Sequence, residues 1–263
     1  MIPLTIAVII ATILSGALVG LLLAVFGGGG SVLAAPLLLY VVGVRDPHIA
    51  IGTSSAAVAA NAAFSLFGHR RGGRVKWPCA VAFAVSGLIG SFAGSTLAKA
   101  ISGTHLLLAF AVAMAAIALS MLRRPKSEGD PDVHISASMM LRLAPLGLLT
   151  GFAAGFFGIG GGFLIVPGLM LATGMTMANA TASSLVSVTI FGAATSINYA
   201  ASGLVDWRLA GLLLLGGTLG SVVGLVIAKK LVTRTLLARR GFAGLVLVVA
   251  AYVAWRAWAA VSL

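Results

Sequence analysis

The sequence repeats itself once, with a period of about 130 residues. Residues 16–36 read GALVGLLLAVFGGGGSVLAAP, and residues 147–167 read GLLTGFAAGFFGIGGGFLIVP. With one residue dropped, the correspondence continues downstream, where Ser54, Trp77, Ser91 and Lys99 return as Ser184, Trp207, Ser221 and Lys229. This period is too long for a solenoid repeat, whereas two homologous halves in a strongly apolar chain are the usual construction of secondary transporters.

The composition indicates an integral membrane protein. Of the 263 residues 60% are hydrophobic and 8% are charged, and the mean hydropathy is +1.14. The N-terminal stretch MIPLTIAVIIATILSG lacks a basic start and a small-residue cleavage site, so we expect a retained first span rather than a signal peptide. The net charge of +12 resides in short loops between apolar segments, where membrane orientation explains it better than nucleic-acid binding.

Long uncharged stretches predict five membrane segments in each half. No Asp, Glu, Lys or Arg occurs from Met1 to Val44 or between Arg142 and Asp206. At about 20 residues for each crossing, the first stretch accommodates two passes and the second accommodates three. The second segments, Ser31 to Gly43 and Gly162 to Gly174, are too short for a full crossing and suit half-helices or re-entrant pieces. We therefore predict an all-α, polytopic transmembrane bundle of two inverted repeats, with about 8 to 10 helical segments broken at the glycine-rich stretches.

Most of the Lys and Arg residues lie in three loops. These loops contain Arg70 to Lys76, Arg123 to Arg142, and Lys229 to Arg240. If all three are cytoplasmic, five segments in each half place both termini in the periplasm and invert the second half relative to the first. We expect a first transmembrane repeat over 1–122, a polar cytoplasmic linker over 123–142 and a second transmembrane repeat over 143–263.

The paired glycine clusters are the first candidate site. Glycine at this density breaks a helix, and a break in the bilayer is tolerated only where it is buried or lines a cavity. A new helix after each break would point free N–H groups and a positive dipole end at an anion near the midplane. The alternative is close helix packing. The candidate residues are Gly27, Gly28, Gly29, Gly30, Ser31, Gly158, Gly160, Gly161 and Gly162.

Small polar residues in each third segment are the second candidate. Their hydroxyl and amide groups can donate hydrogen bonds to an oxyanion, although such residues also cap helices and bond across helix contacts. The candidates are Thr53, Ser54, Asn61, Ser183, Ser184 and Asn198. The GxxxG pairs at Gly90 and Gly94 and at Gly220 and Gly224 favour close helix packing instead. We expect Lys99 and Lys229 to extend toward the membrane interface.

Several chemistries find no support in the sequence. Cys79 is the only cysteine, so an intrachain disulfide is excluded, and the four histidines fall at segment ends or in the linker. No carboxylate lies inside a predicted span, which argues against the buried acidic relay of many proton pumps. We expect no enzyme activity, no metal and no cofactor. Coupling to H⁺ or Na⁺, uncoupled movement of an anion, and a homodimer all stay open.

The motifs together resemble the sulfite exporter TauE/SafE family of bacterial membrane permeases. The resemblance rests on the doubled glycine stretch followed by a proline, the A-x-G-T-S element at Ala50 to Ser54, and the G-x-x-G-S-x-x-G elements at Gly87 to Gly94 and Gly217 to Gly224. It implies transport of small sulfur-containing or organic anions, such as sulfite, thiosulfate, sulfonates or sulfoacetate, across the bacterial inner membrane. The second half departs from the pattern, because Ala182-Ser183 replaces Gly52-Thr53 and Ile159 replaces a glycine. Any site is therefore asymmetric.

We thus expect a secondary transporter whose ligand lies between the two glycine stretches and whose inverted halves rock to expose it alternately. An anion channel of the same fold and a non-transporting accessory protein are the alternatives.

Overall fold

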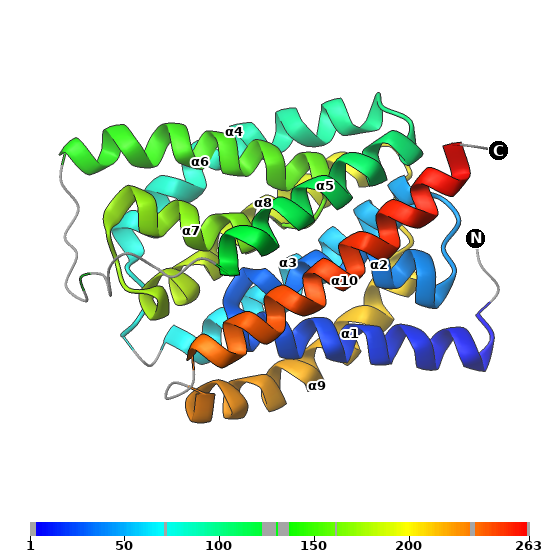
Figure 1. Ribbon diagram of the computed structural model, residues 1–263, viewed down its shortest axis with the longest axis horizontal. Coiled ribbons are helices and arrows are strands. Elements are labelled where there is room, and N and C mark those ends of the chain that lie inside the picture. The colour runs from blue at the N-terminus through cyan, green and yellow to red at the C-terminus, as the bar shows by residue number, and fades with distance from the viewer. Residues whose placement is uncertain are drawn as a thin grey trace.

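The computed structural model describes residues 4–70, 73–122, 130, 137–160, 162–231 and 235–261 as helices and short connections. Over these residues the fold is all-α, as the sequence predicts, and it contains no named strand (Figure 1). Eight of the described helices are long and apolar enough to cross a membrane. These are α1 (Ile6–Phe26), α3 (Pro47–Arg70), α4 (Trp77–Lys99), α5 (Gly103–Leu122), α6 (Ala137–Phe157), α8 (Met177–Ala200), α9 (Trp207–Leu231) and α10 (Thr235–Val261).

Two shorter segments occupy the positions expected for half-helices. The first winds as a 3₁₀ helix, η1 (Gly27–Leu33), then as α2 (Ala34–Leu37) and as a π-helix, η2 (Leu38–Val42). The second is α7 (Gly162–Thr173). Helix α6 begins at Ala137, within the stretch read from the sequence as linker.

Glycine lets two pairs of helices pack backbone against backbone. A Cβ at Gly20 would overlap the backbone of Gly217 in α9, and one at Gly151 would overlap the backbone of Gly87 in α4. Gly16 of α1 lies opposite Leu213 of α9, and Gly20 lies opposite Gly217. The residue numbers increase in the same direction along both helices, so α1 and α9 run parallel. The α4–α6 pair is parallel by the same criterion. Small residues on both faces permit such close approach in lipid.

Side-chain hydrogen bonds join α3 to α9 and α8 to α4, and they recur in corresponding pairs. Ser65 Oγ of α3 donates to Ser221 Oγ of α9 at 3.3 Å, and Ser91 Oγ of α4 lies 3.1 Å from Thr195 Oγ1 of α8. One repeat length separates Ser65 from Thr195 and Ser91 from Ser221. These bonds group the helices into two bundles, each drawn from both halves of the chain, and α3 and α8 pack extensively against each other where the bundles meet. We name them bundle A (α1, η1–η2, α3 and α9) and bundle B (α4, α6, α7 and α8).

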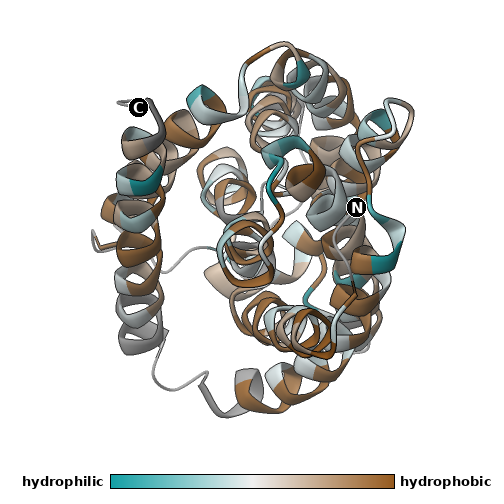
Figure 2. Cartoon of the chain, turned by 90° about the vertical axis from the view of Figure 1, so that its right-hand side faces the viewer, coloured by the Kyte–Doolittle hydropathy of each residue, from teal (hydrophilic) through white to brown (hydrophobic). Residues whose placement is uncertain are grey.

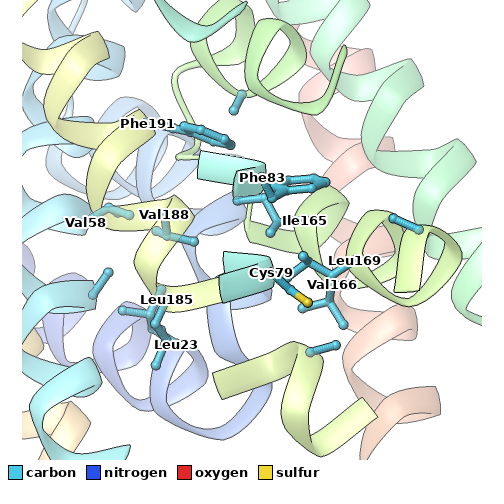
Figure 3. Close-up of a cluster of buried hydrophobic side chains, with 14 of the residues drawn as sticks. Leu23, Val58, Cys79, Phe83, Ile165, Val166, Leu169, Leu185, Val188 and Phe191 are labelled. Carbon is cyan, nitrogen blue, oxygen red and sulfur yellow. The ribbon is translucent and has the colours of Figure 1, made fainter. Parts of the chain in front are cut away.

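Bundles A and B meet across a largely apolar contact between α3 and α8. These helices run antiparallel, with Gly52 beside Tyr199 and Ala59 beside Gly192. Val58 and Val188, which hold corresponding positions, are both fully buried in the same core cluster (Figure 3). Such small and aliphatic surfaces pack closely, and a hydrogen bond from Ser55 of α3 to Gly158 at the end of α6 also joins the two bundles.

Helices α5 and α10 pack against each other and cover η1 on the side away from α3 and α8. Phe110 and Met114 of α5 and Phe242 of α10 join Val32, Leu33 and Ile159 in one buried cluster. Viewed nearly along the helices, hydrophobic residues occur along most of the described helices (Figure 2). Large apolar side chains such as Ile6, Leu141 and Val248 are well exposed on these helices, as a lipid-facing surface requires.

The start of α1 and the end of α10 lie at one end of the molecule. In Figure 1 both are on the right, whereas α3 and α9 end, and α6 and α10 begin, toward the left. The helix ends that flank the three basic loops therefore gather opposite the start of α1 and the end of α10.

Candidate functional site

The second glycine cluster is a true break between α6 and α7. Helix α6 ends at Phe157 and α7 begins at Gly162. Between them Gly158 and Gly160 have φ of 63° and 61°, a left-handed conformation that favours glycine. A Cβ on Gly158 would also overlap the side chain of Ile51 in α3. The expected interruption is therefore present in this half, although Gly161 lies outside the described residues.

The first glycine cluster behaves differently from the expectation. After α1 the backbone keeps a helical winding, because Gly27 to Gly30 and Ser31 all lie in the 3₁₀ helix η1. The chain nevertheless reverses direction, since a Cβ at Gly30 would overlap the backbone of Leu22 and Leu23 in α1. This half thus has a tight re-entrant hairpin rather than an interruption followed by a new helix. Four successive glycines provide the room for that reversal.

The two short segments lie next to each other inside the protein. Segment η1 packs against α7, and both lie between the α3–α8 pair and the α5–α10 pair. At their contact Ile159 is 1% exposed and shares a cluster with Val32 and Leu33. The glycine stretches of the two halves are therefore brought together, as the sequence predicts, with Ile159 wedged between them.

Ser55 of α3 fastens the break between α6 and α7. Its Oγ donates to the carbonyl oxygen of Gly158 at 2.8 Å and also lies 2.8 Å from the carbonyl oxygen of Ile51. Ser55 lies in the same sequence motif as Thr53 and Ser54 but is not among the residues that the sequence predicts to bind a ligand. Residue type could not single out Ser55, because Ser54 beside it is also a serine and only the fold shows which hydroxyl reaches the distant turn.

Thr53 and Ser183 hold corresponding backbone N–H groups. Thr53 Oγ1 accepts from the N–H of Asp206, just before α9, and Ser183 Oγ accepts from the N–H of Lys76, just before α4, each at 2.9 Å. These bonds satisfy donors at the starts of the two helices. Ser54 and Ser184 donate to carbonyl oxygens one turn earlier, those of Ile51 and Thr181. All four hydroxyl residues are fully buried.

Asn198 lies near the end of α8, about ten residues or 15 Å along the helix from Val188, which contacts Gly160. Its Oδ1 and its carbonyl oxygen accept from Lys99 Nζ at 2.9 and 3.0 Å, and its Nδ2 donates to Ser95 Oγ at 2.7 Å. Lys99 lies at the end of α4, where we expected it to extend toward the membrane interface, and its Nζ binds the end of α8. The structure thus separates Asn198 from the glycine stretches.

Asn61 lies in the α3–α9 contact against Gly217. The side chain is 0% exposed, and neither Nδ2 nor Oδ1 has a hydrogen-bond partner among the described residues. Val58, one turn earlier, lies beside Gly160. Asn61 is therefore a buried polar group within one helical turn of the break.

The comparisons with known proteins agree with this architecture. The sulfite exporter TauE/SafE family matches residues 12–253. A probable membrane transporter protein of Xylella fastidiosa (strain 9a5c) is 48% identical over 97% of this chain and 98% of its own length. The probable membrane transporter protein YunE of Bacillus subtilis (strain 168) is 26% identical over 84% of this chain and 89% of its own. No solved structure matches the chain.

A match over nearly the whole sequence, together with eight spans and two short segments, points to a membrane transporter rather than to an enzyme. This chain belongs to the TauE/SafE sulfite exporter family of multi-pass membrane proteins.

Proposed function

We propose that this protein is a secondary transporter of small sulfur-containing or organic anions, such as sulfite, thiosulfate, sulfonate or sulfoacetate, in the bacterial inner membrane. The observation that carries the proposal is the break at Gly158 and Gly160, which places the start of α7 inside the bundle and beside η1. A helix that starts within a membrane protein presents unpaired N–H groups and the positive end of its dipole. Transporters use such half-helix N-termini to hold anionic groups.

The charge distribution supports an anion over a cation as the main substrate. All five acidic residues lie outside the spans, at Asp46, Glu128, Asp130, Asp132 and Asp206. Backbone N–H groups near Gly160 and Gly162 would therefore bind an oxyanion without a competing carboxylate. In this proposal Ser31 of η1 contributes its hydroxyl to the ligand, whereas Thr53 and Ser183 hold the starts of α9 and α4. Ser54 and Ser184 bond carbonyl oxygens of their own helices and line the same helices on either side of the break.

We infer that the two halves are inverted repeats and that bundles A and B, rather than the two sequence halves, are the bodies that move. The hydrogen bonds from Ser65 to Ser221, between Ser91 and Thr195, and at the starts of α9 and α4 each lie within one bundle, whereas the bond from Ser55 to Gly158 joins the two bundles. A sliding contact at Val58 and Val188 would open the site first to one side and then to the other. By the positive-inside rule, the basic loops are cytoplasmic and both termini are periplasmic.

Counterflow in liposomes tests this function. Purified protein is reconstituted, the vesicles are loaded with unlabelled sulfite, and uptake of labelled sulfite is followed; thiosulfate and sulfoacetate are then tested in the same way. A transporter accumulates label transiently against the label's own gradient, whereas an anion channel gives fast flux without counterflow. An accessory protein gives neither. Absence of counterflow with every anion would overturn the proposal.

Gly160→Leu tests the site within the same assay. The substitution forces a branched side chain into a left-handed turn between Val58 and Val188, so counterflow should be lost. Gly211→Leu is the matched control, because Gly211 is exposed on α9 with nothing within 4 Å of a Cβ. Normal counterflow in both variants would exclude the break as the binding site.

A further inference from the structure

Asn61 is a buried amide that the packing of the protein does not require. Phe191 occupies the corresponding position in the second half, where its ring lies against Gly87 just as the amide of Asn61 lies against Gly217. An apolar side chain therefore fills this kind of space in the same fold. Because an unpaired buried amide destabilises a folded protein, Asn61 needs a polar role.

The groups around Asn61 are rich in oxygen. One turn later in α3, Ser65 Oγ donates to Ser221 Oγ at 3.3 Å, and Ser221 Oγ donates to the carbonyl oxygen of Gly20 in α1 at 3.2 Å. Both hydroxyl hydrogens are thereby committed to bonds inside the protein. The hydroxyl oxygen of Ser221 still has a lone pair for a ligand, and so does the amide oxygen Oδ1 of Asn61.

This arrangement suits a cation better than a second anion. Small hard cations prefer carbonyl, amide and hydroxyl oxygens as ligands. An oxyanion would need several N–H or O–H donors, and here the amide Nδ2 of Asn61 is the one group of the three side chains with hydrogens to give, because both hydroxyl hydrogens are already bonded. The described part of the chain also holds no group of three His, Cys, Asp or Glu that would instead suit a transition metal.

We propose that Asn61, Ser221 and Ser65 form a binding site for a small monovalent cation, Na⁺, at the junction of α1, α3 and α9. Its role in coupling rests on the proposed anion transport. No carboxylate lies in the spans to balance the cation, so the anion bound at the break provides the opposite charge. Val58, one turn from Asn61, lies beside Gly160, and opposite charges attract strongly in a medium of low dielectric constant.

This placement makes the two ligands reinforce each other. Binding of Na⁺ raises the affinity for the anion, and the anion raises the affinity for Na⁺ by the same factor. The site would thereby give the transporter a coupling ion without the acidic residue that many ion-coupled transporters use.

Thermal unfolding of the purified full-length protein tests the cation site without any transported anion. The protein is titrated with NaCl, with KCl or choline chloride keeping the chloride concentration constant. Na⁺ should raise the melting temperature more than K⁺ or choline does, because a ligand that binds only the folded state stabilises it. Equal effects of the three salts on the wild-type protein would overturn the proposal.

The corresponding positions of the two halves provide the variants that test the cation site. Asn61→Phe installs the residue that the other half uses, so the protein should fold and lose the Na⁺ effect. Ser221→Ala, which retains the amide, should need about tenfold more Na⁺ for the same effect. Ser91→Ala is the matched control, because Ser91 is equally buried and holds the corresponding position without an amide beside it. It should keep the full Na⁺ response.

If Na⁺ raises the melting temperature of Asn61→Phe as much as that of the wild-type protein, the proposed site is wrong. If Asn61→Phe does not fold, Ser221→Ala decides: an unchanged Na⁺ dependence of its melting temperature would overturn the site. Failure of the cation site is distinguishable from failure of the transport function. Anion counterflow that is independent of Na⁺ would contradict the coupling and leave anion transport intact. The opposite outcome is also possible: Na⁺ stabilises the wild-type protein but not Asn61→Phe, and no anion gives counterflow. That result would support the cation site and contradict the transport function.

Discussion

At the residue scale, hydroxyl groups of one half hold the helix starts of the other. Thr53 and Ser183 accept the N–H groups of Asp206 and Lys76 at equal distances. The sequence made both hydroxyls candidates for the ligand because they lie in a repeated motif. It could not show that each of them accepts a hydrogen bond from a backbone group more than one hundred residues away.

Thr53→Val should therefore lower the stability of the protein. The substitution keeps the shape of the side chain and removes the acceptor at the start of α9, at a cost of about 1 kcal/mol. Ser54→Ala is the control, because the Ser54 hydroxyl donates to the carbonyl oxygen of Ile51 within its own helix, and the described residues give it no bond to another helix. Chemical or thermal unfolding in detergent measures the difference. Equal stability of the two variants would mean that the Asp206 bond contributes little.

The asymmetry between Asn61 and Phe191 also belongs to this scale. Aligned halves show that the two positions differ, but residue type alone leaves a packing role and a ligand role open for Asn61. Burial of the amide with no hydrogen-bond partner among the described residues separates these roles, and residue type alone does not show it.

At the element scale, glycine determines which helices pair. The GxxxG elements of α4 and α9 were predicted to be packing surfaces, and they lie against α6 and α1. The sequence also predicts the short second segments and their place beside the glycine stretches. It does not predict that η1 stays wound, because consecutive glycines permit both a 3₁₀ reversal and an open turn.

Gly151→Leu should prevent α4 and α6 from packing. The new side chain would have to occupy the place of the Gly87 backbone, so we expect destabilisation by more than about 3 kcal/mol, with loss of folded protein from the membrane. Gly244→Leu in α10 is the matched control, since a Cβ at Gly244 meets nothing within 4 Å. Size-exclusion profiles of the extracted proteins measure the outcome. A normal profile for Gly151→Leu would show that the α4–α6 pair tolerates separation.

At the scale of the whole molecule, the two repeats of the sequence do not form two separate structural units. Each bundle takes helices from both halves, because α1 packs on α9 and α6 packs on α4. From the sequence we expected the two halves to move as bodies, since covalent order was the only grouping available. Packing between distant helices supports our proposal that bundles A and B are the moving bodies.

Disulfide cross-links test which bodies move. In a Cys79→Ser background, Ala59→Cys with Gly192→Cys joins the two bundles, because a Cβ at Gly192 lies 3.1 Å from that of Ala59, close to the separation of about 3.8 Å in disulfides. This pair should block anion counterflow until it is reduced. Ser91→Cys with Thr195→Cys joins helices within bundle B and should leave counterflow unchanged. The opposite pattern would mean that the halves move as units.

The central claim is that an anion binds where the two short segments meet. The most direct measurement is an experimental structure of the protein with selenite, which has the shape of sulfite and an anomalous signal that locates it. We expect a peak inside the membrane region between η1 and the start of α7, near Gly160 and Gly162. A structure with selenite only at the basic loops, or with none bound, would contradict the account.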